Sequence, residues 1–284
     1  MAPLRSSYLK LLKNSAMLLA WLCMVMIWKL REVYQYREVI WNFVTQDLRV
    51  RYQRSILGML WTLIKPALML LILTLVFGLL FRRNFQHFVV YLGSGLLAWL
   101  FFADAANSGS GAIIHRGSTY LTRVYLPKAV FPFVTTAAAL VNFFFSLVAL
   151  IILMIFLRHN FTIWLIVLPL AITCLALFGM GVSLWLACLT VYLRDLEHLT
   201  DVLLRAWFYL TPIIYPIDMI PEKHRYLFYF NPMFHILHLF QTSLYYGRPP
   251  DTMCLIAAPL ISAFVFLTGA AVFFWREREF VFLV

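Results

Sequence analysis

Long apolar runs restrict this chain to a structure that crosses a lipid bilayer several times. About six runs approach or exceed the ~18 apolar residues needed to span a ~30 Å hydrocarbon layer. They cover residues 56–81, 88–106, 130–157, 161–192, 202–217 and 254–275. Only 12% of the 284 residues are charged, about half the share found in soluble domains. We therefore expect an all-α polytopic membrane protein with one membrane domain and no large soluble domain.

The distribution of basic residues sets the expected orientation. Six spans place both termini on one side of the membrane, and 16 of the 23 Lys and Arg residues then fall on that side. Because basic residues in short loops favour the cytoplasm, we expect both termini, including the tail over residues 276–284, to be cytoplasmic. The net charge of +11 then indicates attraction to anionic membrane lipids, worth about 1 kcal/mol per basic residue, rather than nucleic-acid binding.

The first 30 residues form an extension before the membrane domain, which we place at residues 31–284. Residues 16–28, AMLLAWLCMVMIW, are apolar, but a run of about 13 residues is short for a bilayer span. No small-residue cleavage site follows, and Lys29 and Arg31 come next, which argues against a signal peptide. An interfacial helix is favoured here over an additional span.

Residues 31–55 predict an amphipathic helix at the cytoplasmic surface. Apolar residues recur at steps of three and four, at Val33, Tyr36, Ile40, Val44 and Leu48. The opposite face carries Gln35, Glu38, Asn42, Gln46 and Arg49. This period indicates a helix with one apolar stripe, which can anchor in lipid, serve as a shelf for a cytoplasmic partner, or do both.

Three arginines stand directly before the first span: Arg49, Arg51 and Arg54. We expect them to hold the surface helix at headgroup depth while the chain turns into the membrane near Gly58.

Lys65 and Pro66 lie inside the first apolar run. Lys65 could contact a substrate phosphate within the membrane, because charges in spans tend to be functional. The simpler interpretation is that Lys65 reaches back to the headgroups and that the helix begins near Trp61, with Pro66 close to its first turn.

Residues 216–251 are rich in Phe and Tyr but are interrupted by prolines, namely Pro216, Pro221, Pro232, Pro249 and Pro250. The resulting pieces are too short to cross the bilayer. They fit half-helices that dip into the outer leaflet and return, shielded by other protein, and such pieces could act as a gate.

Catalytic motifs are absent from the sequence. No G-x-x-x-x-G-K-[ST] phosphate loop occurs, so we assign the binding of ATP and Mg to a partner subunit and no cofactor or catalytic residue to this chain. The one acidic cluster, Asp195, Glu197 and Asp201, is accompanied by Arg194 and Arg205. Surface ion pairs are favoured there over acid and base catalysis.

Candidate metal ligands are few. Cys23, Cys174, Cys188 and Cys254 lie in apolar stretches without metal-like spacing and are interpreted as small buried residues. His235 and His238 could share one helix face, but the sequence offers no recognisable Cys or acidic cluster to complete a site. We predict aromatic packing for this pair and no metal.

Aromatic residues make up 17% of the chain, and most of them belong in interfacial belts. Those within or near spans could instead stack on the apolar faces of sugar rings. The candidate channel-lining residues are Trp61, Trp99, Phe102, Phe144, Trp207 and Tyr209.

Four stretches carry a family resemblance by their order: QDLRVRYQRSILGMLWTLIKPALMLLILTLVFGLLF, RVYLPKAVFP, VYLRDLEHLTDVLLRAWFYLTPIIYP and FNPMFHILHLFQ. Together they resemble the permease subunit of type-2 ABC exporters, in the branch that exports O-antigen, teichoic acid or capsular polysaccharide. The resemblance covers roughly residues 31–280. It implies six transmembrane helices, an N-terminal cytoplasmic amphipathic helix and short re-entrant periplasmic gate helices.

The resemblance also implies partners and a cargo. The chain would form a homodimer with two copies of a nucleotide-binding ATPase subunit, in the inner membrane of a bacterium. The substrate would be a polysaccharide linked to undecaprenyl pyrophosphate, with O-antigen preferred. The segment that couples to the ATPase maps to residues 107–120, with Ser110, Ile114, His115 and Arg116. The gate maps to Tyr226, Phe230, Asn231 and Pro232.

Other functions stay open at this point. The same permease fold could move a drug or a small lipid. A membrane enzyme acting on lipid-linked sugars is a further alternative. A channel is disfavoured because no repeated ring-forming motif or charged filter is present.

Overall fold

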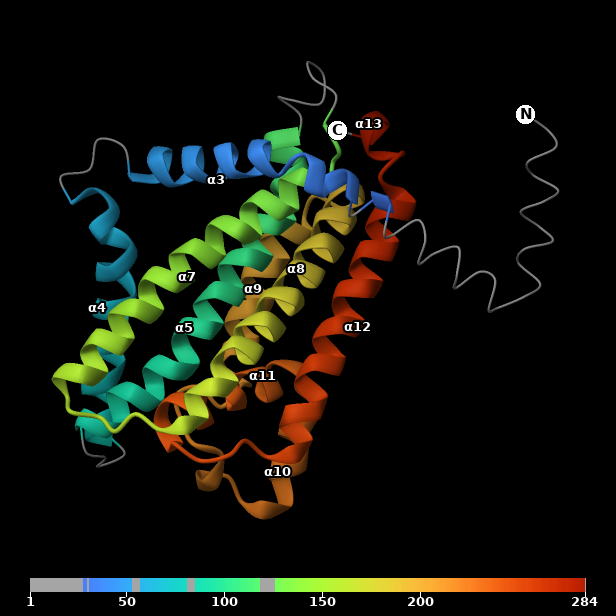
Figure 1. Cartoon of the computed structure of the whole chain (residues 1–284). Helices are drawn as coiled ribbons and strands as arrows, with labels where there is room; N and C mark the ends of the chain where they lie inside the picture. Colours follow the sequence, from blue (N-terminus) through green and yellow to red (C-terminus); the bar gives the residue numbers. More distant parts are fainter. Residues whose placement is uncertain (1–27, 30, 53–56, 81–84, 118–125, 284) are drawn as a thin grey trace.

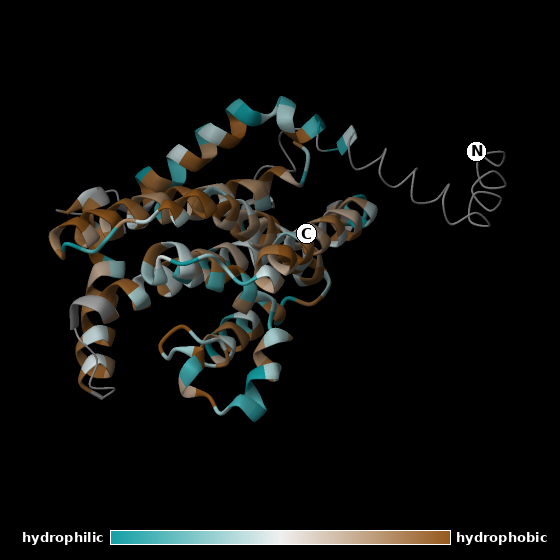
Figure 2. Cartoon of the chain, turned by 60° about the horizontal axis from the view of Figure 1, so that its bottom comes forward, coloured by the Kyte–Doolittle hydropathy of each residue, from teal (hydrophilic) through white to brown (hydrophobic). Residues whose placement is uncertain are grey.

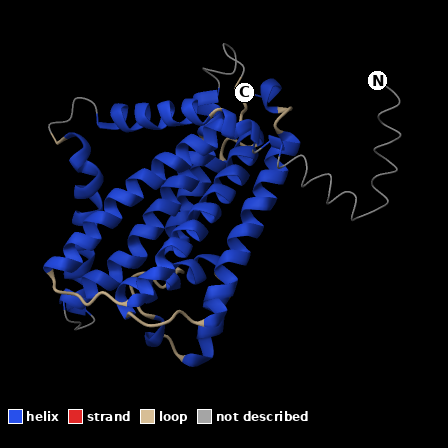
Figure 3. Ribbon diagram, viewed as in Figure 1, coloured by secondary structure: helices blue, strands red, loops and turns tan. Residues whose placement is uncertain are grey.

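The computed structural model describes residues 28–29, 31–52, 57–80, 85–117 and 126–283. Within these ranges the chain consists of helices and loops without strands (Figure 3). The expected interfacial helix at residues 16–28 lies outside them, apart from Trp28.

The α-helices are α3 (Arg37–Tyr52), α4 (Trp61–Leu80), α5 (Phe85–Ser110), α7 (Val130–Phe156), α8 (Leu168–Tyr192), α9 (Leu196–Tyr209), α10 (Glu222–Tyr229), α11 (Pro232–Gln241), α12 (Thr252–Arg276) and α13 (Phe280–Leu283). The 3₁₀ and π-helical segments are η1 (Gly58–Leu60), η2 (Ala112–Gly117), η3 (Ile163–Val167), η4 (Ile217–Met219) and η5 (Thr242–Tyr246).

The long helices form a bundle with two distinct ends (Figure 1). Helix α3 lies across one end and α10 lies at the other, and we call these the α3 end and the α10 end. Among the described residues, α4, α5, α7, η3 with α8, and α12 are long and apolar enough to cross a membrane. Hydrophobic residues cover most of the bundle, whereas hydrophilic residues gather on α3 and around α10 (Figure 2). The chain is therefore a multi-pass membrane protein.

The remaining expected span, residues 202–217, falls largely on α9, which has only 14 residues. A helix of that length rises about 21 Å, less than the ~30 Å hydrocarbon layer. Helix α9 nevertheless takes the chain from the α3 end, where α8 finishes, toward the α10 end, where α12 begins (Figure 1). Five spans are thus supported by length and composition, and a sixth crossing through α9 stays a prediction.

Helix α5 forms the centre of the bundle. In its apolar window, 83% of the residues are buried, compared with 22% to 33% in the other candidate spans. It contacts α4, α7, α8, α9 and α11. The buried side chains of Leu92, Leu96 and Phe102 belong to the main core. Because α5 is surrounded by protein, the aromatic side chains that the structure describes on it are buried inside this chain and do not face lipid.

Two glycines permit the close contact between α8 and α12. A Cβ atom added at Gly269 would lie 2.4 Å from the carbonyl oxygen of Gly181, and one added at Gly181 would lie 2.6 Å from the backbone nitrogen of Phe266. Small residues let membrane helices approach this closely, where packing rather than water exclusion holds them together.

The amphipathic helix follows its predicted pattern. Val33, Val44 and Leu48 are buried, whereas the predicted polar face is exposed. Val44 and Leu48 pack with Val130, Val134 and Ala138, which lie on α7. The apolar stripe of α3 is therefore covered by α7, while α3 itself lies across the end of the bundle.

The first span begins where the sequence predicts. Gly58 has a φ of 49°, a left-handed conformation that glycine adopts without a Cβ clash, and α4 begins at Trp61. Pro66 lies inside α4 and cannot donate a helical hydrogen bond to the carbonyl of Thr62. The hydroxyl of Ser146 on α7 donates to the carbonyl of Asn142 at 2.9 Å and lies 3.5 Å from the Thr62 carbonyl oxygen, so a polar group of a second helix lies beside the interruption.

An ion-pair cluster at the α3 end was missed by sequence reasoning. Lys29 contacts the carboxylates of Glu32 and Glu277, and Lys128 donates to the backbone oxygen of Glu277. Burial alone would lower the pKa of Lys29, but the hydrogen bonds to Glu277 and Glu32 outweigh it and the pKa is raised. The cluster joins residues that precede α3, α7 and α13.

The proline-rich segment is divided into short helices, as expected. Pro216 and Pro221 directly precede η4 and α10, and Pro232 is the first residue of α11. Proline is favoured at this position because its missing N–H has no helical partner there. Whether these helices re-enter the membrane and act as a gate stays a prediction.

Candidate functional site

The predicted coupling segment, residues 107–120, is described as far as residue 117, and this part lies at the α3 end, where α5 passes into η2. The Nε2 atom of His115 lies 2.8 and 3.1 Å from the two carboxylate oxygens of Glu197, which is in the first turn of α9. A Cβ atom at Gly111 would lie 2.5 Å from His115 Cδ2 and 3.0 Å from Glu197 Oε1. The absence of a side chain at Gly111 therefore allows this pair to form.

The other predicted coupling residues differ in exposure. Ser110 is buried, and its hydroxyl donates to the carbonyl of Asn107 at 2.7 Å. Ile114 is half-buried, and His115 is exposed. Arg116 lies in η2, but its side chain is outside what the structure describes. Among the described polar side chains of this set, His115 is thus the one that a partner protein could reach.

The acidic cluster around residues 195–201 forms ion pairs, as expected, but one of them has a partner that the sequence did not indicate. Asp201 pairs with Arg205 at 2.6 Å, whereas Glu197 pairs with His115 and not with Arg194. A cavity of about 260 Å³ beside them is lined by Asn107, Glu197, His198 and Asp201. The sequence could not identify the partner of Glu197 because 82 residues separate it from His115.

Three candidate channel-lining aromatics meet in one cluster inside the bundle. The ring centroids of Trp99 and Trp207 are 6.0 Å apart, and Phe102 lies 5.5 Å from Trp99 and 5.3 Å from Trp207. Phe178 of α8 and Phe208 of α9 complete it. Trp99 and Phe102 are buried, so in this conformation their rings face one another and not an opening.

The other three candidates lie apart from this cluster. Phe144 and Tyr209 are exposed, at 44% and 68%, and could line a passage completed by another chain. Trp61 lines a cavity between α4, α5 and α7.

The cavity beside Trp61 contains polar groups within the spans. It has a volume of about 250 Å³, and its lining includes Lys65, Asp104 and Asn142. Asp104 accepts a hydrogen bond from the hydroxyl of Ser108 at 3.1 Å, and the Oδ1 atom of Asn142 is buried without a hydrogen-bond partner among the described residues. Intramembrane charges of this kind are usually associated with function. Lys65 therefore shares a cavity with an acid and an amide and does not stand alone.

A second cavity, of about 530 Å³, lies between the same helices and is almost entirely apolar. Its lining includes Pro66 and Leu70 of α4, Leu97 of α5, and Leu150 and Phe156 of α7.

Asn231 connects the predicted gate to α9. Its Oδ1 atom accepts hydrogen bonds from the backbone N–H of Met233 at 3.1 Å and from Trp207 Nε1 at 3.0 Å. Its Nδ2 atom donates to the hydroxyl of Thr211 at 2.9 Å. Asn231 is therefore both the N-cap of α11 and a bridge to the aromatic cluster.

An Asn231→Ala variant is expected to lose about 2–4 kcal/mol of stability. The loss combines an N-cap, worth about 0.5–2 kcal/mol, with an indole N–H left without its acceptor, worth about 1–3 kcal/mol. Thermal unfolding of the purified protein in detergent measures this change, with Asn160→Ala at an exposed position as the control. Asn231→Asp keeps the acceptor oxygen and should recover part of the loss. Equal stability of Asn231→Ala and Asn160→Ala would contradict the bridging role.

The other predicted gate and headgroup residues are placed as follows. Tyr226 of α10 and Phe230 are exposed, at 56% and 82%, and Pro232 opens α11. Arg49 is exposed on α3. Arg51 lies in α3, but its side chain and all of Arg54 are outside the described part of the chain. The headgroup role of the arginines stays a prediction.

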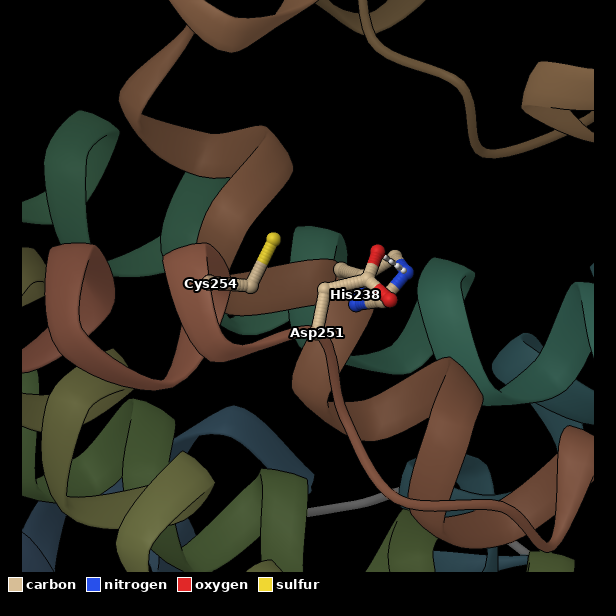
Figure 4. A group of neighbouring side chains, drawn as sticks. All are labelled: His238, Asp251 and Cys254. Carbon is tan, nitrogen blue, oxygen red and sulfur yellow. Dashed lines mark ion pairs between the residues drawn. The ribbon is translucent and has the colours of Figure 1, made fainter.

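The expectation that no Cys or acid would lie beside the histidine pair is wrong. Ligand atoms of His238, Asp251 and Cys254 all lie within 4.8 Å of one another (Figure 4). The proline-containing loop before α12 brings Asp251 and Cys254 back onto α11, a contact that helix periodicity alone does not predict.

Comparisons with known proteins agree with this architecture. Residues 38–245 match the family model described as ABC-2 type transporter, which is more than half of the chain. The chain belongs to the ABC-2 type transporter family. This ABC-2 type chain is 32% identical over 257 residues to the O-antigen export system permease protein RfbA of Myxococcus xanthus, covering 90% of this chain and 98% of that relative.

Two further relatives have related names. An O-antigen export system permease protein RfbA of Klebsiella pneumoniae is 30% identical over 189 residues, covering 66% of this chain and 73% of the relative. The polysialic acid transport protein KpsM of Escherichia coli is 22% identical over 237 residues, covering 82% and 91%. The family match of this ABC-2 type transporter extends from α3 through most of η5 and includes the predicted coupling turn, the aromatic cluster and the predicted gate.

Proposed function

We propose that this chain is the permease subunit of an ATP-driven exporter of polysaccharide linked to undecaprenyl pyrophosphate, with O-antigen as the preferred cargo. The observation that carries the proposal is its 32% identity to an O-antigen export permease over nearly the full length of both chains. The polysialic acid transport relative supports the same class of cargo.

The energy for export comes from a separate subunit. The sequence has no phosphate loop, so two nucleotide-binding subunits bind ATP and Mg, and two copies of this permease form the passage. Membership of the ABC-2 family supports this division of work. The permease contributes no catalytic residue in this proposal, and conformational change in the ATPase is transmitted to it mechanically.

The α3 end faces the cytoplasm of a bacterial inner membrane in this proposal, with both termini on that side. The support is the excess of basic residues in the segments that flank the spans at this end. Helix α9 then provides the sixth crossing, and the short helices α10 and α11 form a periplasmic gate.

The site residues receive matching roles. His115 and Arg116, with Ser110 and Ile114 behind them, dock on the ATPase. Arg49, Arg51, Arg54 and Lys65 attract the pyrophosphate or lipid headgroups. For Lys65, its place in a polar-lined cavity with Asp104 favours contact with a charged or hydroxyl-rich cargo.

One observation favours a second candidate, the export of a drug or small lipid. The 530 Å³ cavity between α4, α5 and α7 is lined by apolar side chains, which suit an acyl chain or an apolar drug better than a sugar.

Deleting this chain in its native host tests the function. The proposal predicts that the surface polysaccharide disappears while its undecaprenyl-linked form accumulates inside the cell. Expression of the chain from a plasmid should restore the surface polysaccharide and remove the accumulated form. A normal polysaccharide surface, with altered export of a drug or small lipid instead, would refute the proposal in favour of the second candidate.

A further inference from the structure

Three potential metal ligands, His238, Asp251 and Cys254, meet where α11 packs on the first turn of α12, with their ligand atoms all within 4.8 Å of one another. His235 and His238 share one face of α11, and Asp251 and Cys254 have the same i, i+3 spacing at the start of α12. His238 Nε2 lies 3.3 Å from Asp251 Oδ2, and a dashed line marks this ion pair in Figure 4. Cys254 Sγ lies 3.5 Å from His235 Nδ1. Bond lengths of about 2.0–2.3 Å to Zn²⁺ place the ligand atoms of a tetrahedral site about 3.3–3.8 Å apart.

His235 lies beside this group. Its Nε2 atom lies 2.9 Å from the carbonyl oxygen of Tyr229, so Nε2 carries the proton and donates it. This tautomer leaves a lone pair on Nδ1, the atom that faces the thiol of Cys254. His235 therefore holds the Cys254 side chain in place beside the other two ligands.

His238 is buried, with 5% of the residue exposed, and its Nε2 atom faces Asp251. Asp251 is exposed and leaves the cluster open on one side for an ion to enter.

We propose that His238, Asp251 and Cys254 bind one transition-metal ion, with Zn²⁺ as the best fit and a water molecule in the fourth position. A thiolate and an imidazole are poor ligands for Mg²⁺ or Ca²⁺, which prefer oxygen, but they suit Zn²⁺. The ion links α11 to α12 and thereby fixes the short helices of the α10 end to the last span. This proposal does not depend on the identity of the exported cargo.

Cobalt binding to the full-length protein in detergent tests the site. The protein is purified with a tag that contains no histidine, treated with a chelator to remove bound metal, and then freed of the chelator. The wild type is expected to bind one Co²⁺ per chain with a thiolate-to-cobalt charge-transfer band, and Zn²⁺ should displace it. Zn²⁺ should also raise the Tm by several degrees, because it binds the folded state.

Matched variants separate the site from nonspecific binding. Cys254→Ser should abolish the charge-transfer band, and His238→Gln should weaken binding more than about tenfold. Asp251→Asn changes an exposed side chain that makes no capping hydrogen bond, so it should fold normally and still weaken binding. Cys188→Ala and His224→Gln, which lie elsewhere, should bind as the wild type does. If Asp251→Asn and Cys254→Ser bind Co²⁺ as tightly as the wild type does, the proposal is overturned.

Discussion

A Gly269→Ala variant is expected to lose the native packing of α12 on α8. The added methyl group would lie 2.4 Å from the carbonyl oxygen of Gly181 and 3.0 Å from Trp185 Cδ1. The nearer obstacle is backbone, which cannot rotate away as a side chain can, so the two helices must separate. Overpacking of this kind costs about 1–3 kcal/mol or more, and we expect the upper part of that range. The yield of monodisperse protein and its Tm in detergent should both fall.

Gly78→Ala provides the matched control in another span. The nearest atom to a Cβ there is Phe88 Cδ1 at 3.8 Å, an ordinary contact. Alanine is favoured over glycine in a helix by about 1 kcal/mol, so this variant should be neutral or slightly stabilised. If Gly269→Ala and Gly78→Ala unfold at the same temperature, the close contact between α8 and α12 is not present in the protein.

A double variant, His115→Ala with Arg116→Ala, is expected to uncouple ATP hydrolysis from export. The ion pair of His115 with Glu197 joins η2 to the first turn of α9, and the side chains are 64% and 35% exposed. An exposed pair contributes only about 0–1 kcal/mol to stability, so the variant should fold and hydrolyse ATP with its partner subunit. Export should fall about tenfold or more, corresponding to a coupling energy of about 1.4 kcal/mol.

Two further variants sharpen this test. Glu197→Gln removes the charge of the same pair from the α9 side and should also reduce export. Arg205→Ala breaks a more exposed pair with Asp201 and should leave export unchanged. Normal export by the double variant would remove the coupling role from this turn, and a loss of ATP hydrolysis would indicate failed assembly instead.

The long spans could be predicted from sequence to within a few residues. The run at 130–157 became α7, and the run at 254–275 became α12, because apolar length is a local property that the bilayer selects. The apolar face of α3 was likewise predictable from its period.

Contacts between distant segments could not be predicted in the same way. The pairs His115 with Glu197 and Lys29 with Glu277 depend on how far each helix is rotated and shifted against its neighbour. The same holds for the approach of Cys254 to His235. The sequence also could not show which aromatic side chains face inward. Trp99 is buried and Phe144 is exposed, although both lie in long apolar runs.

The most direct test of the proposed function is reconstitution of this permease with its ATPase subunit in sealed vesicles. The measured quantity is the movement of undecaprenyl-linked polysaccharide from the ATPase side to the opposite side. The proposal predicts movement only when both subunits and hydrolysable ATP are present. Equal movement by the permease alone, without nucleotide, would contradict it.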